Sequence, residues 1–280
     1  MNLKNAVLAL GLIVAGSATA SFAQESHIGG VTGRPAAGKE LYARYCVGCH
    51  GKQGDGNGEN AAYIDPKPRD FTTAVFKCRS TPTGTLPTDE DVFDAITRGF
   101  VTTWMPAWRP LTKQNRADLV EHIKTYSARW KSEAPGHPIA VPKEPAVTID
   151  GILHGRGLFQ KMECWKCHGP EGRGDGPSAA TLTDSKDNPI RPFNFSAGSR
   201  FKCGESNQDL YRIFMTGIDG TPMPSFADVL QPTDAWDLVH FLRTLQPNHT
   251  LEASVWKQWL TAHANELKPI GPQQTAENLK

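Results

Sequence analysis

The sequence Cys-Val-Gly-Cys-His stands at residues 46–50, and Cys-Trp-Lys-Cys-His stands at residues 164–168. Both stretches have the pattern C-x-x-C-H, and they begin 118 residues apart, at positions 46 and 164. Glycines follow at matching positions, which are 51, 54, 56 and 58 in the first copy and 169, 172, 174 and 176 in the second. Trp-Met-Pro at 104–106 and Pro-Met-Pro at 222–224 repeat the same offset. A shared offset at separate landmarks indicates a duplicated domain.

The pattern C-x-x-C-H is the signature of covalent c-type haem attachment. Cysteines three positions apart lie on one face of a helix, so both thiols can form thioether bonds to one side of a porphyrin. The histidine that follows is then placed to bind the iron. The sequence predicts two covalently bound haem c groups, held by Cys46, Cys49 and His50, and by Cys164, Cys167 and His168.

Two other readings of a C-x-x-C pair carry less weight. A zinc site would require a second pair of cysteines, or a second histidine at ligand spacing, in each half. The sequence shows neither. A redox dithiol does not require the adjacent histidine, and both copies carry one.

Met105 and Met223 are the candidate second axial ligands of the two irons. Each stands 59 residues after the first cysteine of its own motif, at 46 and 105 and at 164 and 223, and each precedes a proline. A thioether on a proline-braced loop suits an axial position, and Met/His ligation raises the reduction potential. The alternative is a methionine that fills a gap in the core.

Two further pairs recur in the two halves. Cys78 and Cys203 end the tripeptide Phe-Lys-Cys in each half, 125 residues apart. Spare thiols in an exported protein favour a disulfide, which would lock the domains together; buried free thiols and an axial thiolate are the alternatives. Arg69 and Arg191 lie in polar loops that match, and they are candidate partners of haem propionates or else solvated surface side chains.

The N-terminal residues have the features of a secretory signal peptide. Lys4 precedes an apolar stretch at 6–15, and small residues at 21 and 23 fit cleavage after Ala23. The apolar stretch is shorter than the roughly 20 residues of a membrane-spanning helix, and an uncleaved anchor is the alternative. We therefore expect a periplasmic protein with no membrane span after cleavage.

Composition excludes some functions and supports a helical globular fold. Of the 280 residues, 39% are hydrophobic and 21% are charged, as in ordinary globular proteins. Lys and Arg total 30 against 29 Asp and Glu, so the sequence lacks the excess of positive charge that is typical of nucleic-acid-binding proteins. No convincing alternating strands occur, and the expected fold is mostly α. Apolar spacing and capping residues predict helices from 36 and from 154 into the two motifs, over 92–98 and 210–215, over 116–130 and 233–245, and over 251–267.

The chain resembles a tandem class I cytochrome c, similar in plan to dihaem cytochrome c4-type carriers. The resemblance rests on a C-x-x-C-H motif near the start of each half, a glycine-rich loop, a Met-Pro loop and a closing helix. It implies two small helical domains, each wrapped around a covalent haem. The expected organisation is a signal peptide at 1–23, an N-terminal domain at 24–131, a proline-rich linker at 132–149, a C-terminal domain at 150–246 and a helical extension at 247–280.

The resemblance also implies a function and partners. We expect single-electron transfer between redox proteins, with a quinol-oxidising complex or a dehydrogenase as donor and a terminal reductase or oxidase as acceptor. Six-coordinate iron leaves no open site for a substrate, so we expect no enzymatic activity. The alternatives are a dihaem redox enzyme of the peroxidase or thiosulfate-oxidising type, and a fixed cytochrome subunit of a larger oxidoreductase.

Overall fold

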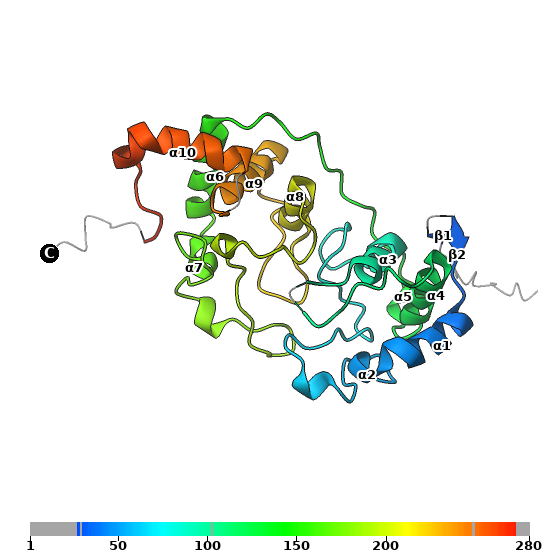
Figure 1. Ribbon diagram of the computed structural model, residues 1–280. Helices are drawn as coiled ribbons and strands as arrows, with labels where there is room; N and C mark the ends of the chain where they lie inside the picture. Colours follow the sequence, from blue (N-terminus) through cyan, green and yellow to red (C-terminus); the bar gives the residue numbers. More distant parts are fainter. Residues whose placement is uncertain (1–26, 29, 102, 248–249, 273–280) are drawn as a thin grey trace, which may run out of the picture.

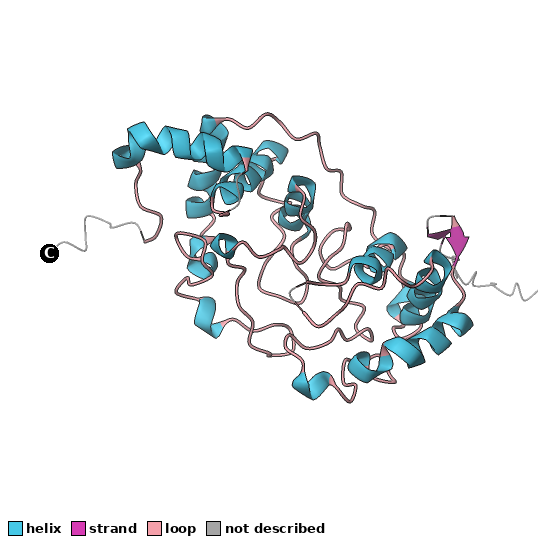
Figure 2. Cartoon of the chain, in the orientation of Figure 1, coloured by secondary structure: helices cyan, strands magenta, loops and turns pink. Residues whose placement is uncertain are grey.

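The computed structural model describes residues 27–28, 30–101, 103–247 and 250–272, so the expected signal peptide lies outside the described residues. The two halves of the chain form two lobes that lie side by side (Figure 1). Helices occupy the outer parts of both lobes, and long loops meet between them (Figure 2). The mostly helical fold class expected from the sequence is confirmed.

The first domain contains a small hairpin and five α-helices among its described residues. Its elements are β1 (His27–Ile28), β2 (Val31–Thr32), α1 (Pro35–Tyr45), α2 (Val47–His50), the 3-10 turn η1 (Ala61–Tyr63), α3 (Asp89–Arg98), α4 (Lys113–Lys124) and α5 (Arg129–Ser132). The second domain and the extension contain α6 (Ile149–Lys161), α7 (Trp165–His168), η2 (Ala179–Thr181), η3 (Phe195–Ala197), α8 (Asn207–Thr216), α9 (Pro232–Thr244), α10 (Leu251–His263) and η4 (Ala264–Glu266).

Capping boxes begin equivalent helices in the two domains. The hydroxyl of Thr88 accepts a hydrogen bond from the backbone N–H of Asp91, whose carboxylate accepts from the N–H of Thr88. Ser206 and Asp209 form the same box before α8. These bonds satisfy N–H groups that the first turn of a helix leaves without partners. The helices α3 and α8 therefore begin at Asp89 and Asn207, three residues before the expected starts at 92 and 210.

Each domain is closed by a crossing of its first and last long helices, α1 with α4 and α6 with α9. Gly38 and Gly155 sit at these crossings. A Cβ atom on Gly38 would overlap the backbone oxygen of Asp118, and a Cβ on Gly155 would overlap that of Asp237. Glycine is therefore required at both positions, because only its bare backbone allows the helices to approach this closely.

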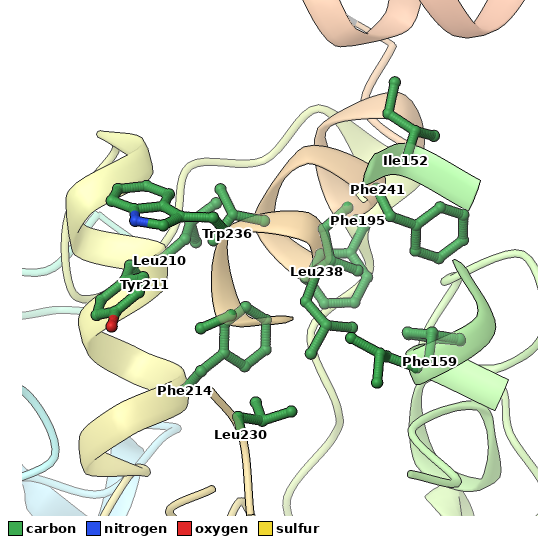
Figure 3. Packing of buried hydrophobic residues seen from close by; sticks show 14 of the residues in the cluster. Ile152, Phe159, Phe195, Leu210, Tyr211, Phe214, Leu230, Trp236, Leu238 and Phe241 are labelled. Carbon is green, nitrogen blue, oxygen red and sulfur yellow. The ribbon is translucent and has the colours of Figure 1, made fainter. Parts of the chain in front are cut away.

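Aromatic side chains fill the core of the second domain (Figure 3). Trp236 on α9 lies against Tyr211 on α8, with ring centroids 4.7 Å apart. Phe241, also on α9, meets Phe159 on α6 edge to face at 5.5 Å. All four side chains are buried. This packing fixes α6, and therefore the direction in which the chain enters the second C-x-x-C-H motif.

Several predicted helices have different bounds in the structure, and the backbone hydrogen bonds explain two of the differences. The expected helix at 116–130 ends at Lys124, because the N–H groups of Thr125 and Tyr126 bond to carbonyls three residues back and tighten the last turn. Residues 129–132 then form the separate turn α5. The helix expected from residue 154 begins at Ile149, where the Thr148 hydroxyl accepts from the N–H of Gly151.

The two domains are joined by a disulfide between Cys78 and Cys203. The sulfur atoms are 2.02 Å apart, the Cα atoms 5.1 Å apart, and both residues are buried. Arg98 of α3 also reaches across and donates to the carbonyl of Cys203 at 3.1 Å. The spare thiols of the two halves are thus paired with each other.

A buried arginine adds a second link between the domains. The side chain of Arg79 has no exposed surface, and its Nη2 donates to the carbonyl of Thr216 at 2.6 Å and to Asp219 Oδ1 at 2.8 Å. The backbone N–H of Gly84 donates to the other oxygen of Asp219 at 2.9 Å. The Asp219 carboxylate of the second domain is therefore held on both oxygens by the first.

The linker and the extension lie on the domains. The linker at 133–148 is extended and crosses from α5 to α6 (Figure 1). Its Gly136 N–H donates to the carbonyl of Leu86 at 3.1 Å, so the linker is fixed to the first domain near its start. Helix α10 packs on α9 and α6. None of the described helices combines the length and the hydropathy that crossing a bilayer requires.

Candidate haem-binding sites

A largely apolar cavity in the first domain brings together the residues that the sequence singles out. It is lined by Cys46, Cys49 and His50 of the first motif and by Met105 of the loop before α4. The cavity encloses about 1250 Å³ of empty space, including its opening to solvent. Residues 59 positions apart in sequence therefore face one space, with the attachment motif and the methionine in the same lining.

His50 is held in the form that a metal ligand requires. Its Nδ1–H donates to the carbonyl of Arg69 at 2.9 Å, which leaves Nε2 with its lone pair. Its ring is stacked on Phe71, with centroids 4.6 Å apart. Burial lowers the pKa of His50 and so favours the neutral imidazole.

The thiols of the first site are free. Cys46 and Cys49 are not paired with each other. Burial raises the pKa of Cys46 to about 12, with a further contribution from Cys49. Trp108 lines the same cavity, and its indole N–H is buried without a partner among the described residues. An apolar cavity with two free thiols, an oriented imidazole and an unpaired donor fits a covalently bound haem.

The methionine loops of the two domains have the same backbone structure. The Phe100 N–H donates to the carbonyl of Met105 at 3.0 Å, and the Met105 N–H donates to the Thr103 hydroxyl at 3.0 Å. In the second domain, Ile218, Met223 and Thr221 make the same two bonds at 3.0 and 3.2 Å. Because the loops are pinned alike, Met105 and Met223 occupy equivalent places.

The second site repeats the arrangement around His168. Its Nδ1–H donates to the carbonyl of Phe193 at 3.0 Å, its ring lies 4.9 Å from that of Phe195, and burial lowers its pKa. Cys164 and Cys167 are free, and burial raises the pKa of Cys164 to about 12. Cys164 and Met223 both pack against the core of the second domain. The same donor set is thus present, and it also fits a covalent haem.

Comparisons with known proteins agree with this geometry. The family described as "Cytochrome c" matches residues 152–246, and the family described as "Cytochrome C oxidase, cbb3-type, subunit III" matches residues 33–123. One solved structure, a chain of the reducing HAO-like protein complex Kustc0457/Kustc0458 of Kuenenia stuttgartiensis, is 42% identical with a TM-score of 0.74. The alignment covers 76% of this chain and 97% of that one. This chain is a tandem class I cytochrome c.

Membership of this family establishes the chemistry in outline. Cytochrome c domains bind haem covalently and transfer electrons, and they work with redox partners. The two family matches lie one in each half of the cytochrome, on either side of the proline-rich linker. A search of curated protein sequences found no match.

Arg69 and Arg191 do not stand at the same position of their two loops. His50 bonds to the carbonyl of Arg69, whereas His168 bonds to that of Phe193, so Phe193 is the counterpart of Arg69. Arg69 lines the first cavity, while Arg191 is exposed at the second site. The loop of the second half differs in length, which displaces the two arginines relative to each other.

Sequence reasoning missed two lysines of the first site. Lys77 and Lys202 both line the first cavity of the cytochrome, although Lys202 belongs to the second domain. They are the middle residues of the repeated Phe-Lys-Cys, which drew attention only through its cysteines. The repeated Phe-Lys-Cys would have pointed to both lysines, because a disulfide between its cysteines brings the two copies together.

Proposed function

We propose that the chain is an exported dihaem electron carrier in which both irons have His/Met ligation. The observation that carries this proposal is that Met105 lines the same cavity as the first C-x-x-C-H motif. In the second domain, equivalent backbone hydrogen bonds hold Met223 in a loop of the same structure. When bound, the haem iron supplies reversible one-electron oxidation and reduction.

The residues of the chain have defined roles in this proposal. The four motif cysteines hold the two groups covalently. The Nδ1 bonds fix the orientation of His50 and His168 and keep Nε2 free for iron. The Met105 and Met223 thioethers would be the second protein ligands of the two irons, and Met/His ligation would raise their reduction potentials. The largely apolar lining of the first cavity limits the contact of its site with water.

The physiological setting is the finer part of the proposal. We propose that the carrier works in the periplasm, after cleavage following Ala23, between respiratory redox proteins. A quinol-oxidising complex or a dehydrogenase supplies electrons, and a terminal reductase or oxidase accepts them. Mass spectrometry of the mature protein tests this cleavage, since an N-terminus at Gln24 supports it and a retained N-terminus contradicts it.

A second candidate is a lasting subunit of a larger oxidoreductase. It is favoured by the likeness to a chain of a two-component HAO-like complex, which covers 97% of that chain. Purification from the native source at raised salt distinguishes the two candidates. A subunit stays with its partner under these conditions, and a mobile carrier elutes alone.

An optical spectrum tests the ligation and the enzymatic alternative together. We expect two low-spin c-type haems, a charge-transfer band from Met to iron, and no change when carbon monoxide is added to the reduced protein. Carbon monoxide binding or a high-spin signal would contradict full His/Met ligation. It would favour a peroxidase or a thiosulfate-oxidising enzyme.

Methionine variants make this test specific. Met105→Ala and Met223→Ala should each open one iron to carbon monoxide and remove half of the charge-transfer band. Met215→Leu is the matched control, because Met215 packs against the core of the second domain. Its spectrum should be unchanged. If neither loop variant differs from the control, these methionines are not ligands.

A further inference from the structure

Four Lys and Arg side chains line the cavity of the first domain. Lys67 donates to the backbone carbonyls of Ala61 and Ala62, which leaves three others to consider. Arg69 and Lys77 come from the first domain and Lys202 comes from the second, and all three contribute to the cavity lining. The cavity that holds the first haem motif is therefore built from both domains.

These cations lack close anionic partners in the described part of the chain. None of Arg69, Lys77 and Lys202 makes a salt bridge or a side-chain hydrogen bond there. Burial is the largest cause that lowers the pKa of each, and it brings that of Lys77 to about 8. The positive charge of Arg69 lowers the pKa of both lysines further. The three charges are thus close enough to repel one another.

Carboxylates nearby offset this repulsion only partly. Asp184 and Asp70 attract Arg69, and Asp184 also attracts Lys77, while Asp65 attracts Lys202. Asp70 is already engaged in an ion pair with Lys186. Partly buried cations without close partners are unfavourable unless an anion joins them. An anion bound in this cavity would therefore be stabilised by the three positive charges.

The disulfide holds Lys202 in this place. Its neighbour Cys203 is bonded to Cys78, and its other neighbour Phe201 is buried in the core of the second domain. The guanidinium of Arg243 lies 5.4 Å from the centroid of the Phe201 ring. Lys202 is thus fixed on both sides and presented to the first domain.

We propose that Arg69, Lys77 and Lys202 form a carboxylate-binding site for the propionates of the first haem, so that the second domain completes the haem site of the first. The inference rests on the proposed binding of haem in the first cavity. Two carboxylates would supply the missing anions, and charge-assisted hydrogen bonds are the strong ones. Lys202 acts as a positioning residue, and its charge favours the reduced, less positive form of the first iron.

The second site has no matching arrangement at the corresponding position. Phe193 stands where the first domain has Arg69, and it stacks on Phe201 with centroids 4.7 Å apart. The proposal therefore predicts an effect of Lys202 on one haem only, and that haem belongs to the other domain.

The test is a redox titration of the purified holoprotein with Lys202→Gln, fitted with two one-electron steps. We expect the midpoint potential of one haem to fall, with about a tenfold change in its equilibrium constant for reduction, which is about 59 mV for a one-electron couple. The other potential should stay unchanged. Lys202→Arg should restore the lost potential, and Lys257→Gln on the exposed face of α10 is the control for charge loss.

Assignment of the affected haem uses the Met105→Ala background. Carbon monoxide holds the opened first haem reduced, so the remaining wave belongs to the second haem, and Lys202→Gln should leave that wave unchanged. Equal shifts of both haems, or no shift of either, would overturn the proposal. The haem content of Lys202→Gln distinguishes failure of this inference from failure of the proposed function. A normal haem content with unchanged potentials refutes the role of Lys202 and leaves the proposed electron carrier intact.

Discussion

The two domains carry the same candidate ligand residues in surroundings of different polarity. In the first domain, the helix crossing behind the haem motif packs His122 against both Tyr42 and Tyr126, and His122 Nε2 is 3.0 Å from the Tyr126 hydroxyl. In the second domain, Phe159 and Phe241 meet at the corresponding crossing. Basic side chains also line the cavity of the first domain, whereas Phe193 stands in place of Arg69 in the second domain.

This difference shows what duplication kept and what it changed. The hydrogen bonds that orient the histidines and pin the methionine loops are the same in both halves. The side chains one layer further out differ in charge and polarity. Polarity and hydrogen bonding around a haem tune its potential. The two sites are therefore expected to have unequal potentials, which would give electrons a preferred position within the molecule.

The largest expected effect comes from removing one attachment motif at a time. Cys46→Ala with Cys49→Ala should leave about one haem per chain, since the other motif lies in a domain with its own core. Cys164→Ala with Cys167→Ala should do the same for the other site. The haem-to-protein ratio measures both, and the remaining potentials compare the sites directly. Loss of both haems from either variant would show that the domains mature together.

Cutting the covalent link between the domains should have the next largest effect. The Cys78–Cys203 bridge spans 125 residues. Closing a loop of this length stabilises a chain by about 5 kcal/mol in the entropic model. Cys78→Ala with Cys203→Ala should lower the free energy of unfolding by that amount in a denaturant titration. An unchanged midpoint would mean that the interface holds the domains without the bridge.

The buried arginine offers a smaller and more local change. Arg79→Met leaves the Asp219 carboxylate without its buried partner, and breaking such a pair costs about 3 kcal/mol. Arg200→Met removes an exposed pair with Glu205 and should cost less than about 1 kcal/mol. Denaturant unfolding of both variants gives the comparison. Equal effects would show that the Arg79 link contributes little.

The smallest expected effect is the contribution of His122, in the first domain, to the pH dependence of the unfolding free energy. Burial lowers the pKa of His122, with a further contribution from Lys39, so the unfolded chain binds a proton more readily than the folded one. The stability that neutral His122 contributes is present above its ordinary pKa of about 6.5 and is lost as pH falls through its lower folded value.

His122→Phe tests this point, because it gives the first domain the residue found at the second crossing. The unfolding free energy of the variant should fall less steeply below pH 6.5 than that of the unchanged protein. Phe241→Leu is a control without a titrating group. A variant that keeps the full slope would assign the pH dependence to other residues.

Local features of the fold were predictable from the sequence because they depend on neighbours in the chain. Thr88 with Asp91, and Ser206 with Asp209, specify capping boxes within four residues, and both helices begin there. The repeated motifs specified the family and the mostly helical fold. The end of α4 at Lys124 was not predictable, because apolar spacing continues through Tyr126 while the backbone bonds have already shifted.

Features that depend on loop length could not be predicted from the sequence. Arg69 and Arg191 look equivalent along the sequence, but the histidine bonds show that Phe193 is the counterpart of Arg69. An unequal loop between two fixed landmarks has no unique alignment. The place of Lys202 in the cavity of the other domain depends on how the domains pack, which no motif within one domain specifies.

The position of the disulfide imposes an order on the maturation of the chain. During synthesis from the N-terminus, Cys78 follows Cys46 and Cys49 and must wait until Cys203 has been made, after the second haem motif. An oxidant that acts earlier can pair Cys78 only with thiols that are needed for thioether bonds. Thiol–disulfide exchange proceeds readily among accessible thiols, so haem attachment before oxidation is the order that leaves a single pair to join.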